Sequence, residues 1–196
     1  PHYWFYPCGI YWRLLMSVIG SNILAGASSQ GGYTIEESLR FNSSQSSYLN
    51  RTPTTTGNQK TFTISLWMKR GSGGNYIIKV SEFYLYLAGD NLNYYDLRQG
   101  SNGLILKTNA VFRDFSAWYH VVLAVDTTQA TASNRSKLYV NGEQVTSFST
   151  AAYQNLNENS FFNSTAAHLI GGSSGNYFDG YLTEVNFIDG QALTPS

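Results

Sequence analysis

The chain is predicted to be an all-β protein in which two antiparallel sheets pack face to face. Short runs of apolar, aromatic and β-branched residues are separated by turns rich in Gly, Asn and Ser. No segment keeps the periodicity of an amphipathic helix. With 42% hydrophobic and 15% aromatic residues among 196, the chain can bury the core of one domain. These three observations together favour a sandwich.

The clearest strand is expected from Thr61 to Lys69. Strict alternation of apolar and mainly polar residues is typical of a half-buried strand. The apolar face of this segment consists of Phe62, Ile64, Leu66 and Met68.

A recognisable turn follows two further strands. Trp118 to Asp126 is the first strand, and Lys137 to Val140 is the second. The second runs into Asn141-Gly142, the dipeptide that best tolerates positive φ at both central positions of a two-residue hairpin. We therefore expect a tight hairpin turn at this dipeptide.

The remaining strands are shorter. Residues 76–87 are expected to form two strands around Ser81-Glu82, and residues 38–41 and 47–49 to pair with each other around a polar turn. Residues 149–165 are expected to be a long polar loop. Other strands are expected at 104–107, 168–172 and 181–188.

The charge balance excludes some classes of partner. Twelve basic and twelve acidic residues give a net charge of zero, so the chain lacks the basic surface that attracts nucleic acid or anionic membranes. Low net charge also removes a defence against self-association, and we therefore expect a homo-oligomer. The single Cys8 cannot form a disulfide within the chain.

The N-terminal region is rich in aromatic residues. Residues 13–27 resemble a signal peptide with an A-x-A-like end, but Ser21 and Asn22 interrupt the apolar run, which is also too short to span a bilayer. We expect no membrane insertion. Two interpretations stay open: residues 1–32 are an arm that docks on a partner or on its own domain, or Met16 is the natural start.

The strand from Trp118, the Asn141-Gly142 turn and the segment from Phe178 to Phe187, followed by Gln191 to Pro195, resemble a laminin-G-like, concanavalin-A-like domain in their order and spacing. The resemblance covers residues 33–196. It implies that the sandwich is a jelly roll. The expected arm of residues 1–32 precedes this domain and departs from the usual start of such proteins, which would lie near Met16.

A narrower resemblance concerns residues 38–42, 48–53 and 61–71, which are similar to the opening of laminin-G-like proteins from tailed bacteriophages of marine bacteria. The segment from Phe178 to Val185, with residues 189–196, fits the same group. This resemblance implies a virion protein that is a tail fibre, a tip adhesin or a head-decoration protein. Its expected partners are other virion proteins, reached through the arm, and a bacterial surface glycan.

Enzymatic activity is not expected. Glycan hydrolases on related jelly rolls set two carboxylates across one concave sheet, but Glu184 and Asp189 fall on opposite faces of their strand. No pair of histidines at metal-ligand spacing is present. His120 shares a face with Trp118 and Val122, so we expect a hydrogen-bonded core histidine.

Calcium is the metal that the resemblance suggests, since laminin-G and pentraxin relatives bind it at the rim of the sandwich through oxygen ligands. The loop at Ser173 to Asn176, where a pentraxin-like site would lie, has no acid. A weaker site would use Asp90, Asn91, Asn93 and Asp96. The favoured alternative is a turn whose side chains bond their own backbone. We expect no other cofactor.

Sugar binding would require aromatic rings beside amides and carboxylates. Tyr94, Tyr95 and Asp96 supply that combination, because tyrosine offers both apolar area and a hydroxyl. A second group of this composition is Tyr153, Asn157 and Glu158. Jelly-roll sheets also bury tyrosines, which is the structural alternative.

The sequence thus predicts a non-enzymatic virion structural protein whose domain recognises a glycan or a protein. A purely structural role in capsid decoration is a second hypothesis. The third is a carbohydrate-binding or adhesion module of a cellular secreted protein, located outside the cell instead of in a virion.

Overall fold

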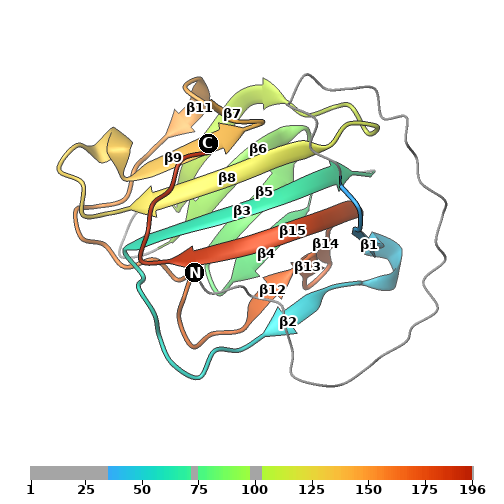
Figure 1. The fold of residues 1–196 in the computed structure, drawn as a ribbon, viewed down its shortest axis with the longest axis horizontal. Helices are drawn as coiled ribbons and strands as arrows, with labels where there is room; N and C mark the ends of the chain where they lie inside the picture. The colour runs from blue at the N-terminus through green and yellow to red at the C-terminus, as the bar shows by residue number, and fades with distance from the viewer. Residues whose placement is uncertain (1–34, 72–74, 98–102, 196) are drawn as a thin grey trace.

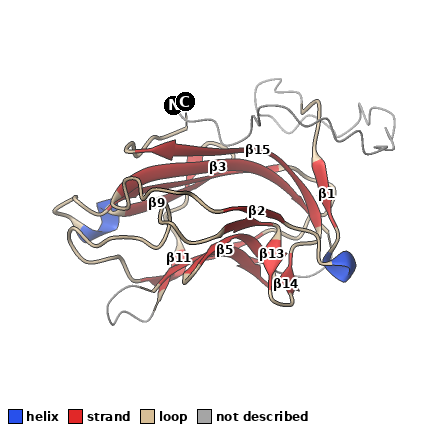
Figure 2. Cartoon of the chain, turned by 90° about the horizontal axis from the view of Figure 1, so that it is seen from below, coloured by secondary structure: helices blue, strands red, loops and turns tan. Residues whose placement is uncertain are grey.

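The computed structural model describes residues 35–71, 75–97 and 103–195. Two sheets pack face to face, and Figure 2 shows β15 and β3 in one layer with β5 and β11 in the other. This all-β sandwich is the predicted jelly roll. The predicted arm at residues 1–32 lies outside the described residues. Within the described ranges, no helix is long and apolar enough to cross a membrane.

Sheet A has six strands in the described part of the chain (Figure 1). In spatial order they are β1 (Leu39–Phe41), β15 (Gly180–Asp189), β3 (Thr61–Arg70), β8 (Tyr119–Asp126), β9 (Ser136–Val140) and β10 (Glu143–Gln144). Every pair in this sheet is antiparallel.

Sheet B forms the opposite layer. Its main path is β11 (Phe148–Ala151), β7 (Leu104–Val111), β6 (Asn91–Asp96), β5 (Phe83–Ala88), β4 (Tyr76–Val80), β12 (His168–Ile170) and β2 (Leu49–Arg51). A small hairpin of β13 (Gly172–Ser173) and β14 (Asn176–Tyr177) adds to β4 through one parallel pairing. Two short 3₁₀ turns, η1 (Ser43–Gln45) and η2 (Ala132–Asn134), complete the described elements.

The core lies between the sheets and is built from alternate residues of their strands. The predicted strand from Thr61 to Lys69 is confirmed as β3, and its predicted apolar face is buried at 0–1% exposure. The neighbouring strand β8 contributes Val121, Leu123 and Val125. Because both strands are central in sheet A, they place a continuous apolar surface against sheet B.

The predicted hairpin is also confirmed. Asn141 has φ 51° and Gly142 has φ 83°, as a two-residue turn with both central residues left-handed requires. The turn joins β9 to β10, which pair Val140 with Glu143. The two strands predicted within residues 76–87 are likewise present as β4 and β5.

One predicted pairing is wrong. Residues 38–41 and 47–49 do not pair with each other: β1 pairs with β15 in sheet A, and β2 pairs with β12 in sheet B. Between them the side chain of Asn42 accepts a hydrogen bond from the amide of Ser44 and caps η1. The chain therefore crosses from one sheet to the other at this point instead of forming a hairpin.

Steric crowding requires a glycine at position 180, where β15 begins. Gly180 has φ +150°, and a Cβ at this position would lie 2.3 Å from the backbone oxygen of Lys69 and 2.9 Å from the ring of Phe178. Phe178 itself is 1% exposed. Only glycine lets β15 approach β3 this closely at the end where the two strands begin to pair.

Substituting Gly180→Ala is expected to destabilise the protein by about 3 kcal/mol or more, because both the backbone conformation and the space oppose a Cβ. Urea denaturation measures the loss. The matched control is Gly89→Ala, where φ is +60° and a Cβ would meet no atom within 4 Å; it should cost only about 1–2 kcal/mol. Equal losses in the two variants would contradict the packing argument.

His168 in β12 provides a pH-dependent contact in the interior. Its Nε2 accepts from the amide of Asn163 at 3.1 Å, and its Nδ1 lies 2.8 Å from the carbonyl oxygen of Ala166. The ring is 4% exposed and packs edge-on against Phe162. Burial lowers the pKa of His168 from 6.5 to about 4.

The folded state disfavours the charged ring. The contribution of neutral His168 to the free energy of unfolding should therefore be fully present above pH 6.5 and should fall as the pH drops toward 4. We expect a loss of about 2–3 kcal/mol over two pH units, measured by urea denaturation. The variant His168→Gln has no proton to gain and should flatten that slope. An unchanged slope in the variant would assign the pH dependence to other groups.

Candidate ligand-binding face

The outer side of sheet B presents four half-buried tyrosines, which we call the tyrosine face: Tyr76, Tyr84, Tyr86 and Tyr95. The residues from Phe83 to Leu87 alternate strictly, so three apolar side chains enter the core while two tyrosines point away from it. Tyr95 likewise follows a buried residue in the neighbouring strand β6.

A β-bulge turns the fourth tyrosine outward. Tyr76 pairs with Tyr86, and the next pair is Ile78 with Leu85, so Ile77 is an extra residue in β4. Ile77 and Ile78 are both buried. Without the bulge, Tyr76 would share the inward face of Ile78, because side chains alternate along a strand.

The four rings form one continuous cluster across β4, β5 and β6. Tyr76 and Tyr84 stack with centroids 4.8 Å apart and planes inclined by 10°. Tyr84 also packs against Tyr95 at 5.0 Å. Tyr86 meets Tyr76 at 5.9 Å and 79°, an edge-to-face contact. Each ring therefore supports its neighbours in a fixed orientation.

Charged groups border the cluster. The Lys79 ammonium lies 5.3 Å from the ring centroid of Tyr84 and 5.6 Å from that of Tyr76, within cation–π range. The Tyr84 hydroxyl donates to the Glu82 carboxylate at 2.7 Å. Burial, followed by this hydrogen bond, raises the pKa of Tyr84 well above its usual value, and burial also raises the pKa of Tyr76 and Tyr86. The phenols of Tyr76, Tyr84 and Tyr86 thus stay protonated at neutral pH.

This surface combines ring carbons, hydroxyls, an ammonium and a carboxylate. Ring carbons can contact the C–H groups of a sugar, and the polar groups can bond its hydroxyls. The sequence signal for the site was the alternation of tyrosine with Phe and Leu in β5, which the sequence prediction did not use.

The structure separates the first predicted sugar-binding group. Tyr95 belongs to the tyrosine face, whereas Tyr94 and Asp96 point the other way and are 0% and 3% exposed. The Tyr94 hydroxyl lies 3.1 Å from Asp96 Oδ2 and accepts from Gln154 at 2.7 Å, and Gln154 accepts from Ser136. Tyr94 and Asp96 therefore serve a buried polar network and cannot share a ligand with Tyr95.

The second predicted group lies in the loop between β11 and β12. Tyr153 is half-buried and packs against the core. The exposed Asn157 donates its amide to the carbonyl oxygen of Thr127, just after β8. The Glu158 carboxylate accepts from the amide of Asn155 at 2.7 Å. The contacts of these three residues hold the loop to the sandwich. None of the three belongs to the tyrosine face.

The four residues predicted for calcium do not converge. Asp90 stands before β6 and Asp96 is its last residue, so the strand separates them by about 20 Å. The Asp90 carboxylate pairs with Arg70 and Arg113, each at 2.9 Å, and these guanidinium groups lower its pKa. Asn91 donates to the carbonyl oxygens of Thr108 and Ala110. Asn93 points to the outer side of sheet B.

His120 is hydrogen-bonded as predicted, but its predicted place in the core is wrong. Its Nε2 lies 2.9 Å from Ser65 Oγ, and its ring stacks on Trp67 at 4.8 Å. Val121 and its alternate neighbours fill the core side of β8, so His120 lies on the outer side of sheet A. Trp118 precedes β8 and is only half-buried.

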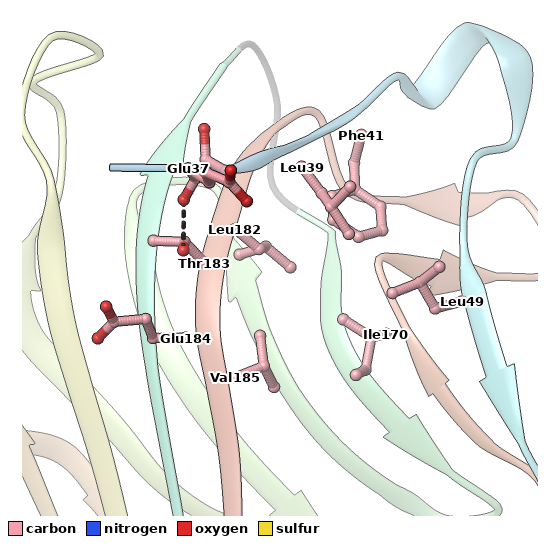
Figure 3. A pocket seen from close by; sticks show the side chains of 10 residues that line it. Glu37, Leu39, Phe41, Leu49, Ile170, Leu182, Thr183, Glu184 and Val185 are labelled. Carbon is pink, nitrogen blue, oxygen red and sulfur yellow. Dashed lines mark hydrogen bonds between the residues drawn. The ribbon is translucent and has the colours of Figure 1, made fainter. Parts of the chain in front are cut away.

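A pocket of about 220 Å³ lies at the open edge between the sheets, where β1 and β15 face β2 and β12. Figure 3 shows apolar side chains from both sheets turned toward it, with Glu37 and Glu184 at its border. The apolar lining consists of Leu39, Phe41, Leu49, Ile170, Leu182 and Val185. The remaining lining residues are Glu37, Ser38, Thr183 and Glu184, and the Thr183 hydroxyl already donates to the carbonyl oxygen of Glu37.

Comparison with known proteins identifies the class of the domain. A family model described as the concanavalin A-like lectin/glucanases superfamily matches residues 42–196, and the chain belongs to that superfamily. The domain is thus of the laminin-G-like, carbohydrate-binding type, which serves as a recognition module. A lectin-type fold of this kind is typically non-catalytic.

Two solved structures illustrate the fold. A native heptameric SAP-like pentraxin from Limulus polyphemus is 17% identical with a TM-score of 0.50, covering 75% of this chain and 71% of the pentraxin chain. Domains LG4-5 of the mouse laminin alpha1 chain are 12% identical with a TM-score of 0.54, covering 82% of this chain and 44% of the laminin chain. This chain therefore spans less than half of that laminin fragment. A search of curated proteins found no match.

Substituting Tyr94→Phe is expected to destabilise the protein by about 1–3 kcal/mol, since Gln154 and Asp96 would each lose a buried hydrogen-bond partner. Urea denaturation measures this loss. The control Tyr48→Phe concerns a side chain that is 50% exposed and should change stability by less than about 0.5 kcal/mol. A neutral Tyr94→Phe variant would show that the network does not stabilise the fold.

Proposed function

We propose that this chain is a non-enzymatic virion protein of a tailed bacteriophage, and that its tyrosine face recognises a glycan on the bacterial surface. The observation that supports recognition is the tyrosine face itself, four rings fixed by mutual contacts on the outer side of a lectin-type sandwich. Its position on a tail fibre, a tip adhesin or the capsid surface is part of the same proposal.

The virion assignment has separate support in the sequence. The segments at 38–42, 48–53 and 61–71 resemble laminin-G-like phage proteins, and each lies within or beside a strand of this sandwich. Weak binding at one site is enough on a particle, because many copies raise the avidity by about 10²–10⁴ when the geometry allows several contacts at once. The proposed partners are therefore neighbouring virion proteins, further copies of this chain and a surface polysaccharide.

The test is a two-target binding assay with the fluorescently labelled full chain. One target is a panel of intact marine bacterial strains, with and without chelator. The other is phage particles that genetically lack this protein. Binding to particular strains that their purified surface polysaccharide blocks would support the proposed adhesin, and loss of that binding with chelator would add calcium to the site.

Substituting Tyr84→Ala removes the ring that contacts Tyr76, Tyr86 and Tyr95, and should weaken binding to those strains about tenfold or more. The matched control is Tyr181→Ala, a half-buried tyrosine on sheet A that lies under Arg40. Thermal melting should show that both variants fold.

Equal binding by the wild-type chain and the Tyr84→Ala variant would contradict the proposed site. Saturable binding to the particles alone would replace recognition with a purely structural role in capsid decoration. Binding to strains without any binding to particles would favour a secreted cellular adhesion module.

A further inference from the structure

Two residues of the tyrosine face, Tyr76 and Tyr86, belong to a longer registered row that crosses sheet B. The sheet pairs Lys107 with Asn93, Asn93 with Tyr86, Tyr86 with Tyr76, and Tyr76 with Tyr177. Residues that lie directly opposite each other in paired strands project to the same side. These five side chains, from β7, β6, β5, β4 and β14, therefore lie in line on the outer side, and we call them the cross-strand row.

Tyr48 extends this row beyond β14. Tyr177 precedes the buried Phe178, so its own side chain faces outward. The rings of Tyr177 and Tyr48 lie 6.2 Å apart with their planes inclined by 34°. Tyr48 precedes Leu49, whose side chain packs against the core, and it is 50% exposed.

The length of the row exceeds what one sugar can contact. Neighbouring strands lie about 4.8 Å apart, so the four steps from Lys107 to Tyr177 span about 19 Å. The contact with Tyr48 adds a further 6.2 Å. Each strand of the row contributes one aromatic ring or one polar side chain. Successive sugar rings of a polymer can therefore contact successive side chains of the row.

Polar groups occupy one end of the row and aromatic groups the other. Asn93 hydrogen-bonds the Tyr86 hydroxyl, and its Oδ1 is buried without a hydrogen-bond partner among the described residues. Asn93 is itself 1% exposed, so it acts on a ligand only by positioning the Tyr86 hydroxyl. Lys107 lies next to Asn93 in the row and adds a donor.

We propose that the cross-strand row and Tyr48 bind an extended, linear oligosaccharide chain of several sugars, which lies across the strands instead of inserting a single terminal sugar. This inference rests on the proposed glycan recognition and specifies its substrate class. A chain in this orientation would contact Tyr86 and Tyr76 in the middle of the sheet and reach Tyr48 at its edge. Its affinity would then depend on its length.

The experiment is isothermal titration calorimetry on the full-length chain with oligosaccharides of two, four and six sugars. The probes are the cello-, malto- and xylo-series, together with size-fractionated partial hydrolysates of the surface polysaccharide from a strain that the labelled protein binds. Affinity for at least one series should rise about tenfold or more between the dimer and the hexamer, because additional subsites become occupied.

Two variants locate the distal subsite. Tyr48→Ala should reduce the affinity for the hexamer to near that of the tetramer and leave the dimer unchanged, whereas Tyr84→Ala should weaken binding of both the hexamer and the dimer. Tyr48 is the preferred position because a side chain that is 50% exposed contributes little to the stability of the fold. Tyr181→Ala, on the outer side of sheet A, is the matched control and should change neither affinity.

The outcomes separate the two proposals. A hexamer that binds no better than the dimer, or a Tyr48→Ala variant that binds the hexamer as the wild-type chain does, overturns the extended site and leaves glycan recognition standing. Failure of every probe to bind, including the hydrolysates, overturns glycan recognition and the extended site with it.

Discussion

One aromatic cluster fixes the position of the two sheets relative to each other. Phe62 of β3, Phe83 of β5, Phe187 of β15 and Phe162 from the loop before β12 have neighbouring ring centroids 4.9–6.3 Å apart. Truncating a buried Phe typically costs about 3–5 kcal/mol, so this contact is among the strongest that a core offers. Because Phe83 is held inside, the alternation of β5 holds Tyr84 and Tyr86 outside. The candidate binding face therefore depends on packing on the opposite side of the same strand.

The sequence predicted those elements whose local pattern determines their structure. The alternation of β3 identified its buried face, and the Asn141-Gly142 dipeptide identified the hairpin, because each signal lies within a few residues. The partners of β1 and β2 could not be obtained in this way. Each strand has three residues, too few to specify a register, and their partners are more than 100 residues away in the chain. Tertiary contacts determine which strands β1 and β2 pair with, whereas the local pattern suggested a hairpin that does not form.

The candidate site was predictable only in part, again for a physical reason. Grouping Tyr94, Tyr95 and Asp96 by composition ignored the fact that neighbours in a strand face opposite sides, and only Tyr95 reaches the outer face. The outward position of Tyr76 was not predictable from periodicity, since the bulge at Ile77 reverses the alternation in β4. Tyr177 and Tyr48 join the row through a parallel pairing and a loop contact between distant segments. Such contacts become visible only once the sheet is assembled.

The two ends of the described fold both run along sheet A. Glu37 accepts a hydrogen bond from Thr183 of β15, while Gln191 and Leu193 contact the hydroxyl of Thr63 in β3, where Figure 1 shows the chain after β15 crossing that strand. Sheet A is therefore the surface against which the first and last described segments pack, and sheet B carries the tyrosines on the opposite surface. The contacts of the two terminal segments and those of the tyrosine face thus lie on opposite layers, so a substitution in either terminal segment leaves the contacts among the tyrosines in place.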